Sequence, residues 1–404
     1  VITLTYQYKL RPNKQQEAEI NLILDVCKSV YNYALRERKD WLSSRKSSIK
    51  SCSIVSEYII PADAPYPNYN NQAKSLTIAK KTYSRLKSVN AQVLQQTLKT
   101  LDRAFSDMKS LGKGFPRFKK KLRSFVFPAM LKNCLGCGQV KFPQLGWVKI
   151  RQSRQYPEGF QAKQTRIIKK ATGYYLMITF TSSELVPDNP VGKVSLGVDA
   201  GVESFIATSG GRLTKAPKFL LDQLRELKLL QRRLKKKKIG SNNWLKSQNK
   251  IAILHEKIAN SRRDWHFKLA NQICDLADNI FVEDINFKSW SKGIVRKQSL
   301  DSGIGQFINE ILPYICWKRG KYYAKVDKNY TSQECPKCGH RQKKKLSDRK
   351  HNCSHCNYQE NRDVAAAKVI RNRGLIAVGH TVNKNACRDG LAGVQLSLFD
   401  LLPS

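Results

Sequence analysis

The chain has no apolar run of about 20 residues, the length that a helix needs to cross a bilayer. Its first residues, VITLTYQYKLRP, alternate apolar and polar side chains and lack the apolar core of a signal peptide. Acidic residues are scarce, since 31 Asp and Glu stand against 73 Lys and Arg in 404 residues. These absences predict a cytoplasmic protein with no membrane partner.

The excess of basic residues gives a net charge of +42, and such self-repulsion opposes compaction unless a polyanion neutralises it. Apolar residues make up 41% of the chain, enough for hydrophobic cores, so the sequence is not that of a disordered protein. We therefore expect a folded protein of about two to four domains that binds nucleic acid. A ribosomal-type or merely soluble basic protein, and a protein that binds heparin or an anionic membrane, are the alternatives.

The eleven cysteines, an odd number, indicate mostly reduced thiols. Two CxxC pairs are separated by fourteen residues and consist of Cys335, Cys338, Cys353 and Cys356. This spacing is typical of a tetrahedral site with four thiolates, which leaves no open ligand position, so we predict one structural Zn²⁺. The alternative ligand set replaces a cysteine by His340, His351 or His355.

The remaining cysteines lack such spacing. Cys134 and Cys137 form a third CxxC pair without a matching pair, and we interpret them as incidental, with a metal role as the alternative. The others are interpreted as buried thiols or bystanders. They are Cys27, Cys52, Cys274, Cys316 and Cys387.

Two short basic segments are candidate nucleic-acid contacts. The loop between the CxxC pairs predicts contacts to backbone phosphates. In FPRFKKK, at 115–121, Phe115 and Phe118 interleave with cations, so their rings either stack on bases or belong to a core. The candidate residues are Arg117, Lys119, Lys120, Lys121, Lys343, Lys344 and Lys345. The run RRLKKKK at 232–238 fits a solvated helix end as well as nucleic-acid contact.

Three acidic residues lie where elements are expected to end or begin. Asp199 closes the strand SLGV, Glu283 closes the strand NIFV, and Asp363 opens the helix DVAAAKVI. Carboxylates so placed can converge on one edge of a sheet, and Mg²⁺ favours such hard oxygen ligands. Because two such ions can promote phosphodiester hydrolysis, the pattern predicts a nuclease with two Mg²⁺ ions. Three unrelated capping or solvated carboxylates are the alternative, and Asp284 would point the other way along its strand.

The first half of the chain predicts helices and a small β domain. Residues 1–10 alternate like a strand, and from Lys14, after a candidate N-cap at Asn13, apolar residues follow a helical period. A loop is expected over 61–71 and a second helix over 91–111. Short apolar runs at 140–150 and 173–182 predict strands, with which 1–10 is expected to pair.

From about residue 191 the pattern is that of an α/β domain. Two strands precede two long helices, whose apolar faces run over 220–234 and 251–276. A strand at 279–283, a helical segment at 307–320 and a strand at 321–327 follow. The cysteine-rich segment then interrupts the pattern before a last helix.

Several strings resemble the TnpB family of transposon-encoded RNA-guided nucleases, which is related to the type V CRISPR effectors. The strings are GVDAGV, VEDINFKSW, NYTSQECPKCGH, HNCSHCNYQENRDVAAAK, NAQVLQQTLKTLDRAF, GFPRFKKK and RRDWHFKLA. The resemblance covers nearly the whole chain. It implies a RuvC-like, ribonuclease-H-type nuclease fold in which Asp199, Glu283 and Asp363 are the three metal ligands.

The resemblance also implies a multidomain α/β and α+β architecture. The first strand (1–10) of a small, β-barrel-like wedge domain precedes a helical recognition lobe (11–112), and the wedge continues over 113–190. The RuvC-like nuclease spans 191–331 and 359–380, and it is interrupted by a zinc-ribbon, target-nucleic-acid-binding insertion (332–358). Residues 381–404 form a C-terminal tail.

The implied function is RNA-guided cleavage of target DNA beside a short motif, in a single magnesium-dependent site, by a protein of a prokaryotic transposable element. The implied partners are a guide RNA from the transposon end and double-stranded DNA, with one protein copy per RNA. The chain departs from the family at Asn361, where an acid is usual, and at Ala365, where asparagine is usual. A guide-bound regulator that does not cut, and a guide-independent zinc-containing DNA-binding protein, are the alternatives. The guide sequence, adjacent motif and cut positions do not follow from the sequence.

Overall fold

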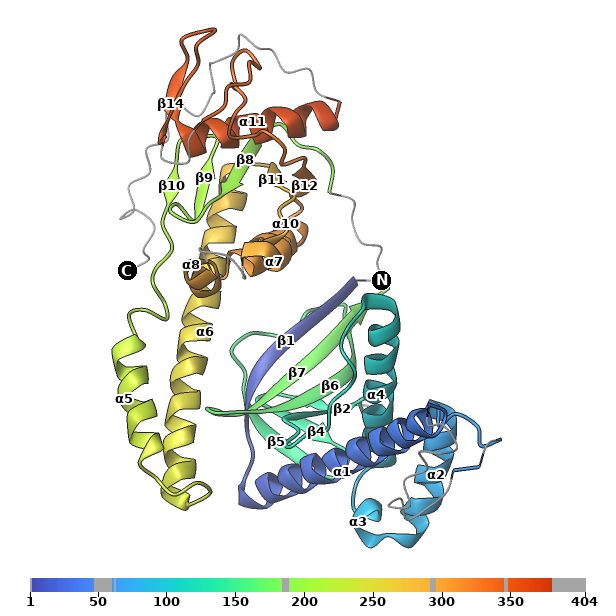
Figure 1. Cartoon of the computed structure of the whole chain (residues 1–404). Helices are drawn as coiled ribbons and strands as arrows, with labels where there is room; N and C mark the ends of the chain where they lie inside the picture. The colour runs from blue at the N-terminus through green and yellow to red at the C-terminus, as the bar shows by residue number, and fades with distance from the viewer. Residues whose placement is uncertain are drawn as a thin grey trace. The chain divides into compact units, whose positions relative to one another are not determined.

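A computed structural model describes residues 2–46, 60–61, 63–131, 133–183, 189–290, 296–344 and 348–379. The chain divides into two compact units, Val1–Val186 and Pro187–Ser404, which are described separately (Figure 1). The predicted tail over 381–404, the candidate contact Lys345, and the cysteines Cys52 and Cys387 lie outside the described residues.

The first unit contains, within its described residues, a curved antiparallel sheet with the strand order β2-β6-β7-β1-β5-β4-β3. The strands are β1 (Ile2–Arg11), β2 (Ser124–Phe127), β3 (Leu135–Gly136), β4 (Gln139–Phe142), β5 (Gly146–Arg151), β6 (Gln161–Lys170) and β7 (Gly173–Ser182). The first strand lies between β7, with Ile2 opposite Ser182, and β5, with Lys9 opposite Arg151. The prediction that 1–10 joins the later strands in one β domain is therefore confirmed.

The helices of the first unit are α1 (Lys14–Ser44), α2 (Tyr69–Thr82), α3 (Ser84–Lys87) and α4 (Ala91–Leu111). At the start of α1, Asn13 accepts from the N–H of Gln16 at 2.8 Å, and the Gln16 side chain accepts from the N–H of Asn13 at 3.1 Å. This capping box confirms the predicted N-cap. The predicted apolar faces of α1 and α4 are buried.

The loop predicted over 61–71 is wrong from Tyr69 onward, because α2 begins there. Asn68, which we interpreted as a loop residue, caps this helix by accepting from the N–H of Asn71 at 3.0 Å. Only Gln72 is buried among the residues of α2, and its apolar stripe is short, since Tyr69, Ala73 and Leu76 are half-buried against the core.

The second unit contains a five-stranded sheet of order β10-β9-β8-β11-β12 within its described residues. The strands are β8 (Ser195–Ala200), β9 (Ile206–Thr208), β10 (Leu213–Thr214), β11 (Asn279–Glu283) and β12 (Tyr322–Val326). The adjacent strands β8, β11 and β12 are parallel, so their carboxyl ends lie at one edge of the sheet.

The helices of this unit are α5 (Leu224–Lys235), α6 (Asn242–Leu276), α7 (Phe287–Trp290), α8 (Arg296–Ser302), α9 (Ile304–Gln306), a π-helical turn (Phe307–Ile311), α10 (Leu312–Lys318) and α11 (Arg362–Ala377). The helix expected from 220 begins four residues later, at Leu224.

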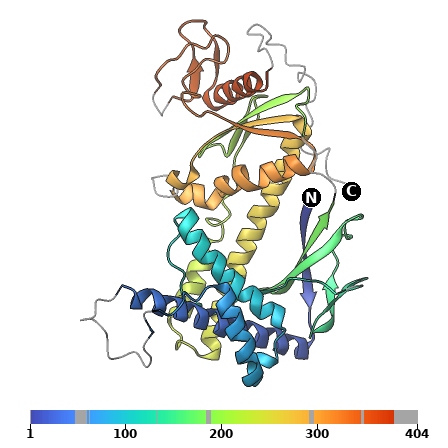
Figure 2. The same cartoon turned by 90° about the vertical axis from the view of Figure 1, so that its right-hand side faces the viewer.

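Alternate residues of β11 face opposite layers: Ile280 and Val282 pack in the core with α6 and α10, whereas Phe281 packs with Ile370 of α11. The sheet thus lies between α11 and the pair α6 and α10 (Figures 1 and 2).

The helix α11 approaches the sheet at two glycines. A Cβ added at Gly197, in β8, would lie 1.9 Å from the carbonyl oxygen of Ala367. A Cβ added at Gly374, in α11, would lie 2.1 Å from a ring carbon of Phe281. Only glycine allows this spacing, and it brings the first turn of α11 beside the end of β8.

The cysteine-rich segment lies between β12 and α11. It contains the antiparallel hairpin of β13 (Lys350–Asn352) and β14 (Gln359–Asn361), in which Lys350 is opposite Asn361. An isolated bridge between Glu334 and Arg341 closes its first half. We call residues 330–361 the ribbon, of which 345–347 are not described.

Candidate active site and metal centre

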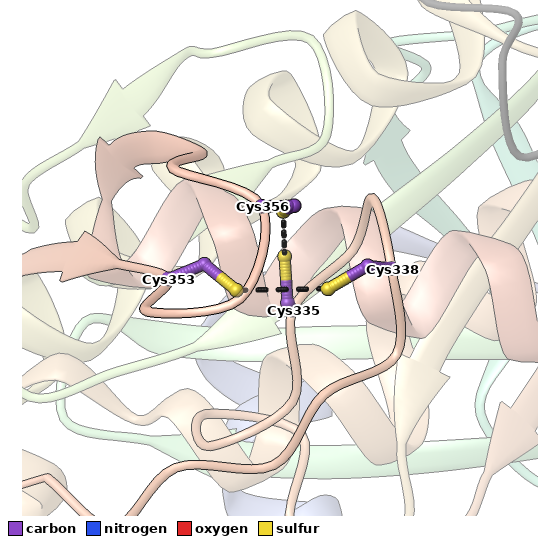
Figure 3. Close-up of side chains that lie close together, drawn as sticks. All are labelled: Cys335, Cys338, Cys353 and Cys356. Atoms are coloured by element: carbon purple, nitrogen blue, oxygen red, sulfur yellow. Dashed lines mark hydrogen bonds between the residues drawn. The ribbon is translucent and has the colours of Figure 1, made fainter.

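The four cysteines of the two CxxC pairs come together in the ribbon (Figure 3). Their Sγ atoms all lie within 4.8 Å of one another, and the Sγ atoms of Cys335 and Cys356, like those of Cys338 and Cys353, are 3.6 Å apart. Within the described part of the chain, no other group of three or more Cys, His, Asp or Glu ligand atoms is this close. The cluster is compatible with a zinc ribbon, as the spacing predicts.

The two CxxC turns have the same backbone design. In the first, the N–H of Gly339 donates to the carbonyl of Cys335 at 2.9 Å, and in the second, that of Asn357 donates to Cys353 at 3.0 Å. Gly339 and Asn357 both have positive φ, at 76° and 57°. Burial raises the pKa of Cys335 to about 12 and also raises that of Cys338, whereas backbone N–H groups of Cys356 and His355 outweigh burial at Cys353 and lower its pKa to about 6. A thiolate is the form that binds zinc.

The three histidines considered as alternative zinc ligands do not belong to the cysteine cluster. His351 is buried and its Nδ1 contacts the Nζ of Lys344, while the rings of His340 and His355 stack with centroids 5.7 Å apart. Cys134 is buried and Cys137 exposed, and neither belongs to a metal-ligand group among the described residues. The set of four cysteines is therefore the arrangement that the structure favours.

The three predicted acids line one open pocket of about 900 Å³ at the edge where the parallel strands end. Asp199 lies near the end of β8, Glu283 ends β11, and Asp363 is in the first turn of α11. Asp284 does not line this pocket and instead pairs with Lys325, at 3.1 Å. The topology therefore brings together three carboxyl groups that are far apart in the sequence.

The electrostatics of the pocket disfavour three bare carboxylates. Burial, and then the neighbouring carboxylates of Glu283 and Asp363, raise the pKa of Asp199 well above its usual range. Burial also raises the pKa of Glu283, although the hydroxyl of Thr331 and the guanidinium of Arg373 oppose that rise. Mutually repelling oxygen ligands of this kind fit divalent cations, which would relieve the repulsion.

Three cations, Lys328, Arg349 and Arg362, also line the pocket. The charge of Arg362 lowers the pKa of Asp199, and Arg349 forms an ion pair with Glu203 in the turn after β8. The sequence analysis did not predict that Lys328 and Arg362 would line the pocket. It predicted only phosphate contacts for the loop between the CxxC pairs, which contains Arg349. The signal was available for Lys328, because it follows β12, the third parallel strand that ends at this edge.

The structure shows the surroundings of Asn361 and Ala365, the two residues that depart from the family pattern. The side chain of Asn361 caps α11 by accepting from the N–H groups of Asp363, at 2.9 Å, and Val364, at 3.4 Å. Ala365 is buried, with 1% of its surface exposed. Glu360, the other acid near the ribbon, pairs with Lys368 at 3.0 Å and does not line the pocket.

The predicted nucleic-acid contacts differ in exposure. Arg117, Lys119, Lys120, Lys121 and Lys343 are exposed. Phe115 and Phe118 are 43% and 49% exposed, which contradicts the alternative that they belong to a core. Lys344 is half-buried, and its Nζ contacts His351 and lies 3.3 Å from the carbonyl of Ser332, so it is directed into the ribbon.

The backbone of this FPRFKKK segment is held on α1. The Nδ2 of Asn32 donates to the carbonyl of Lys119 at 2.9 Å, and the N–H of Lys119 donates to Oδ1 of Asn32 at 2.8 Å. The Nζ of Lys119 lies 5.5 Å from the ring centroid of Tyr31. The segment thus presents basic and aromatic side chains from a fixed backbone.

Three family models match the chain. One described as "Probable transposase" matches residues 179–292, "Cas12f1-like, TNB domain" matches 306–370, and "Helix-turn-helix domain" matches 2–47. The described part of 2–47 is the strand β1 followed by the single helix α1. Within the described residues, no helix is long and apolar enough to cross a membrane.

The chain is similar to full-length relatives. It is 30% identical over 399 residues to "Putative RNA-guided DNA endonuclease InsQ" of Escherichia coli (strain K12), covering 93% of this chain and 92% of that relative. It is 25% identical over 394 residues to "Putative RNA-guided DNA endonuclease" of Streptomyces pristinaespiralis, covering 96% and 91%.

A solved structure described as "Cryo-EM structure of the Cas12f1-sgRNA-target DNA complex" superposes with a TM-score of 0.53 at 15% identity, covering 89% of this chain and 83% of that chain. At this identity the likeness shows the fold alone. Together with the cysteine cluster, it confirms the predicted fold class, a mixed α/β chain with a curved antiparallel sheet and a cysteine ribbon.

Proposed function

Because the chain belongs to the TnpB family, we propose that it is the RNA-guided DNA endonuclease of a transposable element. The relatives named as RNA-guided DNA endonucleases match it over more than nine tenths of both chains. The observation that carries the proposal is the pocket in which carboxyl groups from β8, β11 and α11 meet. A protein that only binds DNA has no need for such a costly arrangement of like charges.

Asp199, Glu283 and Asp363 would hold two Mg²⁺ ions. When bound, such ions supply activation of a water and stabilisation of the leaving oxygen in phosphodiester hydrolysis. The raised pKa of Asp199 supports this role, because a cation in the pocket favours the ionised form that burial disfavours. The volume of the pocket, about 900 Å³, leaves room for part of a nucleotide strand beside the carboxylates.

The cations of the pocket would orient the substrate. Lys328, Arg349 and Arg362 surround the same opening as the acids, so they can bind phosphate oxygens on either side of the bond to be cut. The planar guanidinium groups suit two oxygens of one phosphate, whereas Lys328 provides a point charge.

The cysteine cluster would bind one structural Zn²⁺ that stabilises the ribbon, which is too small and too charged for a core of its own. Exposed cations such as Lys343 would contact target DNA, while the exposed segment 113–121 of the first unit would contact the guide RNA through phosphate and base stacking. We expect the partners to be double-stranded target DNA and a guide RNA from the transposon end, with one protein copy per RNA. We expect the protein to reside in a bacterial cytoplasm and to associate with the nucleoid when it acts. The domain boundaries given by the resemblance, including the recognition lobe (11–112), are part of this proposal.

A guide-bound regulator that does not cut is the second candidate, since Asn361 and Ala365 depart from the family. The structure gives Asn361 a capping role that keeps Asp363 at the start of α11, which favours the cutting enzyme. A guide-independent DNA-binding protein is the third candidate.

Two measurements separate these candidates. RNA that copurifies with the full-length protein is sequenced, and a plasmid carrying the matched target is incubated with the purified complex and Mg²⁺. The enzyme yields transposon-end RNA and target-dependent cleavage, the regulator yields the RNA without cleavage, and the third candidate yields neither. If Asp199→Ala cuts as well as the parent, the site assignment is wrong.

A further inference from the structure

One member of the acid pocket is held by a residue outside the triad. Glu283 is 9% exposed, and the hydroxyl of Thr331 donates to its Oε1. Thr331 is 5% exposed and lies at the base of the ribbon, four residues before the first zinc-type cysteine. A hydroxyl has one proton, so the contact with the carboxylate competes with the weaker one, at 3.3 Å, to the carbonyl of Lys328.

The backbone around Thr331 is tightly fixed. Tyr330, immediately before it, has a positive φ of 62°, a conformation that is unfavourable for a bulky residue. The carbonyl of Tyr330 accepts from the N–H groups of Gln333, at 2.9 Å, and Glu334, at 3.0 Å. An unfavourable conformation persists only where the surrounding contacts determine it, so this turn is built to place the next side chain.

The same turn is tied to α11 by Arg373. Its Nη1 donates to the carbonyls of Asp327 and Asn329, each at 2.8 Å, and its Nη2 donates to Oε2 of Glu334 at 2.6 Å. Because Asp363 lies in the first turn of α11, one helix both supplies an acid of the pocket and fixes the loop that contacts another acid. The ribbon base is therefore part of the frame of the pocket.

We propose that Thr331 is a positioning residue that fixes the orientation of the Glu283 carboxylate in the pocket. The inference rests on the proposed function, because the orientation matters for binding divalent ions there. A charge-assisted O–H···O⁻ bond is among the stronger hydrogen bonds of a protein, and it leaves the carboxylate one rotamer instead of several. Replacing the hydroxyl by a methyl group removes this bond and leaves a buried carboxylate oxygen without its donor.

The test compares three variants of the full-length chain. Thr331→Val removes the hydroxyl and keeps the shape, whereas Thr331→Ser keeps the hydroxyl. Thr97→Val is the matched control, because Thr97 is a buried threonine of α4 whose hydroxyl donates to the carbonyl of Val93 at 3.0 Å. Thr331→Ala is the second deletion, for use if the valine variant does not fold. Mn²⁺ binding to the RNA-free protein is measured by calorimetry, and the Mg²⁺ dependence of cleavage is measured on the guide-loaded complex.

Thr331→Val is expected to weaken Mn²⁺ binding and to raise the Mg²⁺ concentration for half-maximal cleavage by roughly 10-fold, the lower end of the effect of removing an outer partner of a metal ligand. Thr331→Ser is expected to restore both values to near those of the parent. Thr97→Val should lower the melting temperature without a change in either metal dependence.

The inference is overturned if Thr331→Val binds Mn²⁺ as the parent does, or if Thr331→Ser is as impaired as Thr331→Val. Failure of the proposed function looks different. In that case the parent does not cut the matched target, while the calorimetric comparison of Thr331→Val, Thr331→Ser and Asp199→Ala still shows whether the hydroxyl supports a cation site.

Discussion

The cysteine cluster and the acid pocket lie in the same unit but are assembled in different ways. The cluster comes from one short stretch between Cys335 and Cys356, and its ligand atoms lie within 4.8 Å of one another. The pocket takes carboxyl groups from Asp199 to Asp363 and leaves an opening of about 900 Å³. One set of side chains closes around a single point, and the other lines a space that a polymer can enter.

This difference indicates what each centre contributes. A closed set of four ligands has no position for a substrate, so its effect is on the stability of the ribbon. The acid pocket has no such closure, and burial with repulsion raises the pKa of Asp199, so we expect the pocket to destabilise the fold slightly in exchange for the reactive site proposed above. The predictions below test this division between a stabilising and a destabilising centre.

The largest expected effect is that of Asp199→Asn on cleavage. The cleavage rate should fall below detection, a larger loss than the roughly 10–100-fold that follows when a hydrogen-bond partner of a metal ligand is removed. The metal-free variant should nevertheless melt at a higher temperature than the parent, because the substitution removes a carboxylate that is disfavoured by burial and by its neighbours. Plasmid cleavage and thermal unfolding measure the two effects. A variant that melts well below the parent contradicts the view of the pocket as a destabilising centre.

The cysteine cluster should respond in the opposite direction. Cys353→Ser is expected to remove the bound zinc, lower the melting temperature and expose the ribbon to proteases, because metal binding supplies the folding free energy of such segments. Elemental analysis and limited proteolysis with mass spectrometry test this. The parent protein treated with a chelator should give the same cut sites within the ribbon, and cuts spread equally over β8 and β11 would contradict the prediction.

The pH dependence should also differ between the two centres. Folding raises the pKa of Asp199 and Glu283 above the ordinary values of 3.8 and 4.5, so the folded metal-free protein binds more protons than the unfolded chain in the interval above those values. Its free energy of unfolding should therefore rise as the pH falls through the raised values, with this gain complete near the ordinary ones. Denaturant titrations of metal-free parent and Asp199→Asn test it. Equal pH slopes for the two proteins would argue against the shift.

The smallest expected effect belongs to the cap of α11. Asn361→Ala should destabilise the protein by about 1 kcal/mol, the usual cost of removing an N-cap side chain, and should raise the Mg²⁺ requirement because Asp363 loses its fixed helix start. Asn361→Asp retains a capping oxygen and should behave like the parent. Asn13→Ala removes the equivalent cap of α1 and should cause a similar loss of stability without a change in Mg²⁺ requirement.

Local patterns allowed much of this structure to be predicted from the sequence. The capping box of α1 joins Asn13 to Gln16, only three residues away, and each CxxC pair places two sulfur atoms close together. The alternation of side chains along β1 is visible in the first ten residues of the chain. The three acids could be proposed because each stands at the end or beginning of an element.

Features that depend on tertiary contacts were missed. The helix α2 has one fully buried residue, Gln72, and only three half-buried apolar residues against the core, so its apolar face is weak in the sequence. Thr331 reaches Glu283 only because a turn at Tyr330 and the side chain of Arg373 direct it there, and no spacing in the sequence encodes that contact. The exposure of Phe115 and Phe118 likewise depends on how α1 holds the segment, which composition does not reveal.

The two glycine contacts of α11 have a consequence for how DNA is admitted. Gly197 lies against the backbone of Ala367 and Gly374 lies against the ring of Phe281, so no side chain separates α11 from the sheet at these two points. We expect this close packing to restrain the wall of the pocket that carries Asp363. We expect any widening that admits a bulky strand to come from other lining residues, such as Asn286 in the loop before α7, Trp290 of α7 and Gln298 of α8. Changes there should alter the speed of substrate entry and leave the chemistry itself intact.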